Sequence, residues 1–146
     1  MQLRRAAILF VAGSACLEPG GALYEKADTT PPQVLFSLMK PQILGPDAGV
    51  PLVQAGQTIE LPFDEEMDPD SLRPGIVVRI NPERNEIPLT ILAPPPGPGT
   101  YIVRISSAEG SFASAVYTMQ LRSLLIDAAG NPITEGPELT GFFRVP

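Results

Sequence analysis

The stretch that decides the fold runs from residue 58 to residue 63 and reads Thr58-Ile59-Glu60-Leu61-Pro62-Phe63. Its apolar side chains at Ile59, Leu61 and Phe63 alternate with other residues. In an extended chain, alternate side chains point to opposite faces. The stretch therefore predicts a β-strand with one buried face. Pro62 lacks the N–H that a central strand needs, so it predicts an edge strand, a bulge or a change of sheet.

The same alternation recurs along the chain. Tyr101, Val103 and Ile105 form one row, and Tyr117, Met119 and Leu121 form another. Apolar runs bounded by Gly, Pro and Asp complete a set of seven predicted strands: 33–38, 58–63, 75–80, 87–92, 101–105, 117–121 and 141–145. No segment shows a convincing amphipathic helix. The pattern predicts an all-β protein, an immunoglobulin-like antiparallel β-sandwich of about seven strands.

Composition excludes several kinds of chemistry. The chain has 146 residues, the size of one domain with a short appendage, and it contains no histidine and a single cysteine. Catalytic Ser-His-Asp and Cys-His systems, histidine zinc sites and intrachain disulfides are therefore excluded. The net charge is -6 and the basic residues are scattered, which disfavours a nucleic-acid partner. We expect no enzyme, although a carboxylate pair is formally available.

The first sixteen residues have the order of an export signal. Basic residues in Met1–Arg5 precede an uncharged apolar run, Ala6–Ala12, and small residues, Gly13–Ala15, precede Cys16. This order is typical of a signal peptide, and the apolar run is too short for a permanent membrane span. Small residues followed at once by the only cysteine resemble the lipobox of bacterial lipoproteins.

The lipobox resemblance implies cleavage between Ala15 and Cys16 and fatty acylation of Cys16. We expect a lipoprotein signal peptide at 1–15, which forms a signal helix, a lipidated N-terminus and flexible tether at 16–32, and the sandwich domain at 33–146. The protein is then anchored in the bacterial cell envelope, with the membrane as one partner. Leu17 in place of Asp favours the outer over the inner membrane, by resemblance to lipoprotein sorting rules. The alternative is a secreted protein with an incidental cysteine.

Two turn motifs carry a second resemblance. Met67-Asp68-Pro69-Asp70-Ser71-Leu72 and Asp127-Ala128-Ala129-Gly130-Asn131-Pro132 occur in this order, separated by predicted strands. Together with the strand order, they resemble the bacterial SbsA-type Ig-like domain over roughly residues 29–145. The resemblance implies a structural module of exported proteins that has no catalytic residues.

The same two turns are acidic, which makes them candidates for calcium, a cation that prefers oxygen ligands. The candidate ligands are Asp64, Glu66, Asp68, Asp70, Asp127 and Asn131. The alternative is local turn structure, in which Asp68 caps a turn that begins at Pro69 and Gly130 adopts a positive φ. Spatial proximity of the two turns would favour calcium.

Two aromatic positions complete the prediction. Tyr117 begins a strand, where immunoglobulin-like folds often lock a connection with a tyrosine hydroxyl, although core packing alone also explains it. Phe142 and Phe143 are adjacent, so one of them must leave the core and mark an interaction surface or an edge. The sequence predicts a lipid-anchored structural or protein-interaction module of the envelope, with an envelope protein as partner. We expect the protein to carry no cofactor beyond the lipid on Cys16. The alternative function is a calcium- or glycan-binding adhesion module.

Overall fold

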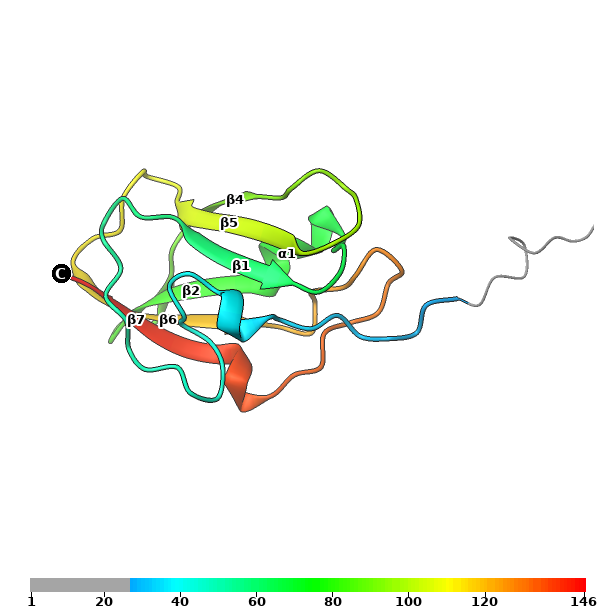
Figure 1. Cartoon of the computed structure of the whole chain (residues 1–146). Helices are drawn as coiled ribbons and strands as arrows, with labels where there is room; N and C mark the ends of the chain where they lie inside the picture. Colours follow the sequence, from blue (N-terminus) through cyan, green and yellow to red (C-terminus); the bar gives the residue numbers. More distant parts are fainter. Residues whose placement is uncertain (1–26) are drawn as a thin grey trace, which may run out of the picture.

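The structure is a computed structural model that describes residues 27–146. Seven strands form two antiparallel sheets around one hydrophobic core, so the predicted all-β sandwich is confirmed (Figure 1). The predicted signal peptide, the cleavage between Ala15 and Cys16, and the lipidation of Cys16 lie outside the described residues. Among residues 27–146, no helix has the length and apolarity to cross a membrane.

The strand order is that of an immunoglobulin-like sandwich. One sheet has the order β1-β5-β4, built from Ile59–Phe63, Tyr101–Ser107 and Leu89–Leu92. The other has the order β3-β2-β6-β7, built from Asn85–Glu86, Ile76–Asn81, Ala115–Leu121 and Thr140–Val145. A segment at residues 33–40 runs along the outer side of β1. With this segment in the place of the first strand, although it forms only two isolated bridges, the two sheets follow the immunoglobulin order.

The predicted strand at 33–38 is wrong. Val34 forms a single bridge with Phe63, the chain then forms the 3-10 helix η2 (Phe36–Leu38), and Lys40 bridges Glu60. The reason is Pro62, which is confirmed on an edge strand. Its carbonyl accepts from the N–H of Leu35 at 2.9 Å, but it has no N–H with which to continue the ladder. The segment leaves β1 there and rejoins it at Lys40.

Two further expectations are corrected. The predicted strand 87–92 is shorter, because β4 begins at Leu89, whereas the N–H of Ile87 donates to Val78 of β2 in the other sheet. The expected absence of helix is also wrong, since α1 spans Pro69–Gly75. Its start is as predicted: an Asp68 side-chain oxygen accepts from the N–H of Asp70 at 3.0 Å, and Pro69 occupies the first turn.

An aromatic cluster fills the core between the sheets. Tyr117 and Phe143 stack with ring centroids 5.0 Å apart, and Phe112 packs edge-on against both. Phe143 is fully buried whereas Phe142 is 45% exposed, so the expected division of this pair is confirmed. The Tyr117 hydroxyl donates to the carbonyl of Ala113 at 2.7 Å and closes the β5–β6 connection. The predicted tyrosine lock is therefore present.

Replacing Tyr117 with Phe should lower the free energy of unfolding by about 1 kcal/mol, because it removes one hydrogen bond and keeps the ring. Urea unfolding followed by circular dichroism measures the change. Tyr101→Phe is the matched control: Tyr101 is 3% exposed, and its hydroxyl forms no hydrogen bond within the described chain. Equal losses in both variants would contradict a locking role for Tyr117.

Candidate functional site

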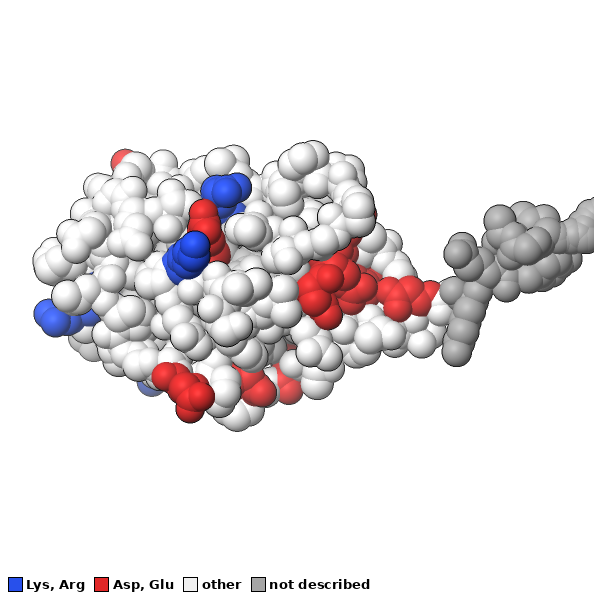
Figure 2. All heavy atoms as spheres, in the orientation of Figure 1, with Lys and Arg blue, Asp and Glu red and all other residues white. Residues whose placement is uncertain are grey.

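The two acidic turns, distant in sequence, pair with each other at one end of the sandwich. Met67 and Asp127 form an antiparallel bridge. The N–H of Asp68 donates to the carbonyl of Ile126, and the N–H of Ala128 donates to the carbonyl of Glu66, each at 3.0 Å. Figure 2 shows acidic side chains gathered at this end, where the chain enters the domain.

Asp127 organises its own turn from a buried position. It is 1% exposed, and one carboxylate oxygen accepts from the N–H groups of Ala129 and Asn131, at 2.9 and 2.8 Å. The other oxygen accepts from the side-chain amide of Asn131 at 2.9 Å. Gly130 has φ +95°, which is the left-handed conformation expected for it. These bonds explain the turn without a ligand.

The carboxylates that converge are not those predicted. Oxygens of Asp28, Glu65 and Asp127 lie within 4.8 Å of one another. Of the six predicted ligands, Asp127 alone belongs to this cluster of acidic side chains. Glu65 lies between the candidates Asp64 and Glu66 but was not itself a candidate, and Asp28 lies in the predicted tether.

The other predicted ligands have separate places. One oxygen of Asp64 accepts from the N–H of Gln33 at 2.9 Å, and Asp68 caps α1. Asp70 is exposed in the first turn of that helix, and Glu66 contributes its backbone carbonyl to the pairing of the turns. Asn131 donates to Asp127 and, at 3.0 Å, to the carbonyl of Asp28. Calcium binding by these turns stays a prediction.

The crowding changes the acidity of one group. The pKa of Glu65 is raised from 4.5 to about 7, and burial is the largest cause. The negative charges of Asp127, Asp28 and Asp64 act in the same direction, in that order of size. Between pH 4.5 and about 7, Glu65 therefore holds a proton that an ordinary glutamate releases.

A second surface lies on the outer face of the four-stranded sheet. Arg79, Thr118 and Phe142 are register partners across β2, β6 and β7, so their side chains share one face. With Asn81 and Arg84 they line a hollow of about 240 Å³. Exposed aromatic and arginine side chains are enriched at protein interfaces. We call this row the arginine face.

Comparison with known proteins supplies no relative. Neither the protein-family models nor the curated proteins contain a match to this chain. The resemblance to SbsA-type domains therefore stays a prediction. The function is therefore inferred from the order of segments along the sequence, from the only cysteine and from the surfaces of the sandwich.

Glu65→Gln should make the protein less sensitive to pH. The native protein binds a proton at Glu65 that the unfolded chain loses above pH 4.5, so this stabilisation is full below 4.5 and is lost as the pH rises through about 7. The variant should melt at a higher temperature than the parent at alkaline pH, and the difference should vanish in acid. Thermal melts in a chelating buffer measure it.

Glu109→Gln is the matched control, because it removes one negative charge from the exposed β5–β6 connection. An equal gain in both variants at alkaline pH would mean that overall charge, and not the acidic cluster, sets the effect.

Proposed function

We propose that this protein is an exported, lipid-anchored and non-catalytic module of the bacterial cell envelope, whose sandwich binds another envelope protein. The position of Cys16 carries the proposal. It is the only cysteine, and it directly follows an apolar run and three small residues. Acylation would give this thiol a chemical role.

Lipid on Cys16 gives the lone thiol a role. An unpaired cysteine in an exported protein calls for an explanation, and acylation is one. Each buried methylene contributes about 0.8 kcal/mol, and two acyl chains suffice for stable anchoring. Residues 17–26 separate Cys16 from the described domain, so they would link the lipid anchor to it.

The arrangement of the domain supports an interaction role. The described chain enters the sandwich at one end, and the C-terminus lies at the opposite end (Figure 1). An N-terminal anchor therefore leaves the far end and the sides of the sandwich, including the arginine face, open to partners. Phe142, 45% exposed between polar neighbours, is an apolar contact of the kind that protein interfaces use.

Cys16→Ser should release the protein from membranes, because serine cannot form the thioether that holds the lipid. Membrane fractionation followed by intact-mass measurement tests this result. Ser14→Ala is the matched control: it exchanges one small residue for another and leaves Cys16 in place, so it should fractionate like the parent. A parent chain that begins at Cys16 without added acyl mass would refute the anchor.

A further inference from the structure

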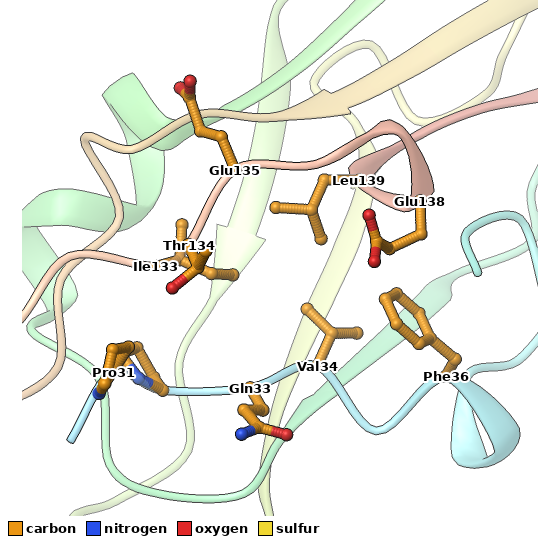
Figure 3. A pocket seen from close by; sticks show the side chains of 10 residues that line it. Pro31, Gln33, Val34, Phe36, Ile133, Thr134, Glu135, Glu138 and Leu139 are labelled. Carbon is orange, nitrogen blue, oxygen red and sulfur yellow. The ribbon is translucent and has the colours of Figure 1, made fainter. Parts of the chain in front are cut away.

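A groove of about 370 Å³ opens along one side of the sandwich. One wall is residues 31–36, and the other is residues 133–139, which lead through the 3-10 helix η3 (Pro137–Leu139) into β7. Figure 3 shows the side chains of Val34, Ile133 and Leu139 between the two walls, with Phe36 at one end. The floor of the groove is therefore apolar.

The wall beside β1 presents unpaired backbone. In the bridge between Val34 and Phe63, the bonds are made by the flanking residues: Leu35 N–H donates to Pro62, and Asp64 N–H donates to the carbonyl of Gln33. In such a pair, the N–H and C=O of the central residue point away from the partner strand. The backbone of Val34 therefore points away from β1, on the side where the groove lies.

Those two groups lack partners in the part of the chain that the structure describes. Val34 is 7% exposed, and neither its N–H nor its C=O forms a hydrogen bond within residues 27–146. Unpaired backbone groups at so buried a residue cost free energy, which an extended chain in the groove recovers by pairing with them. The groove thus offers, at Val34, a backbone donor and acceptor of the kind that strand addition uses.

The neighbouring part of this side is already closed. Arg144 of β7 exchanges backbone hydrogen bonds with Pro51 and Val53, and the N–H of Gly45 donates to the carbonyl of Glu138. The chain itself therefore covers β7 beyond η3. The segment 41–53 therefore covers part of this side of the sandwich, and the groove is the part that it does not cover.

The charge of the groove selects the occupant. Its charged lining residues are Glu135 and Glu138, with no lysine or arginine among them. Glu135 accepts from the N–H of Ser123 at 3.0 Å, and Glu138 forms no ion pair within residues 27–146. Figure 2 shows acidic side chains on the lower edge of the view, where η3 lies in Figure 1. A positively charged chain would compensate the negative charge of this wall.

We propose that the groove binds an extended segment of a partner protein, added as a strand beside Val34. Alternate apolar side chains of that segment enter the groove, and its Lys or Arg side chains face Glu138, which lies beside Phe36 in Figure 3. Glu135, whose carboxylate is turned away from the groove, adds to the negative charge of the rim. The chain's own residues 17–26 are a poor match, because Glu18 and Glu25 outnumber Lys26. This inference deepens the proposed function, since it names the chemistry of the partner.

The test uses the purified full chain in mild detergent and a fluorescein-labelled peptide, Lys-Val-Thr-Val-Lys-Val-Thr. Fluorescence anisotropy should give saturable binding. A peptide with Glu in place of Lys should bind at least about ten-fold more weakly, because like charges then meet. A peptide N-methylated at alternate amides should lose a similar factor, about ten-fold, because it cannot complete the ladder.

Variants of the chain locate the binding. Glu135→Gln with Glu138→Gln should weaken it, whereas Glu83→Gln with Glu109→Gln, an equal change of charge at exposed sites outside the groove, should not. Thr134→Trp, at an exposed position on the wall, should block the groove without disturbing the core. Melting curves confirm that each variant is folded.

The proposal would be overturned by no saturable binding at millimolar peptide, by equal binding of the N-methylated peptide, or by equal weakening by the control pair. A chain that dimerises by light scattering and binds none of the three peptides assigns the groove to a second copy and also overturns the proposal. The assay involves neither Cys16 nor a membrane, so its failure and the failure of the lipid anchor are distinguishable.

Discussion

The pairing of residues 33–40 with the outer side of β1 is the contact on which the rest of this structure depends. An uncovered edge strand invites pairing with other chains, and here Leu35 and Lys40 cover it. Pro62 interrupts the cover because it cannot donate. The chain therefore touches β1 at two points with η2 between them, and at the first point Val34 turns its own backbone groups outward. Pro62 thus interrupts the covered edge, and the register of Val34 opposite Phe63 turns the Val34 groups toward the groove.

The same segment explains the acidic end of the domain. Gln33 N–H donates to the carboxylate of Asp64, and the Asn131 side chain donates to the carbonyl of Asp28. The start of the domain is thereby tied to both acidic turns, which brings Asp28 beside Glu65 and Asp127. The negative charges around Glu65 help to raise its pKa. The carboxylate oxygens of Asp127 accept hydrogen bonds from its own turn. The acids hold the entry point of the chain in place.

Local features were predictable from the sequence where a short-range rule governs them. Period-two alternation located β1, β5 and β6, Asp68-Pro69 indicated a capped turn, and Tyr117 indicated its lock. The helix α1 was missed because its seven residues, Pro-Asp-Ser-Leu-Arg-Pro-Gly, hold too few apolar positions for a helical period. The convergence of Asp28 with Glu65, and the groove beside Val34, were beyond sequence reasoning because both depend on which distant segments pair. The anchor and the partner remain proposals.

The most direct test of this account is residue-resolved amide hydrogen exchange on the purified chain without any peptide. The N–H groups of Leu35, Lys40 and Glu60 are bonded across the β1 edge and should exchange slowly, whereas that of Val34 should exchange much faster despite the burial of its side chain. That pattern is the signature of a β1 edge that is covered at Leu35 and Lys40, with the backbone of Val34 unpaired on the side away from β1. Equal protection of Val34 and Leu35 would contradict the account.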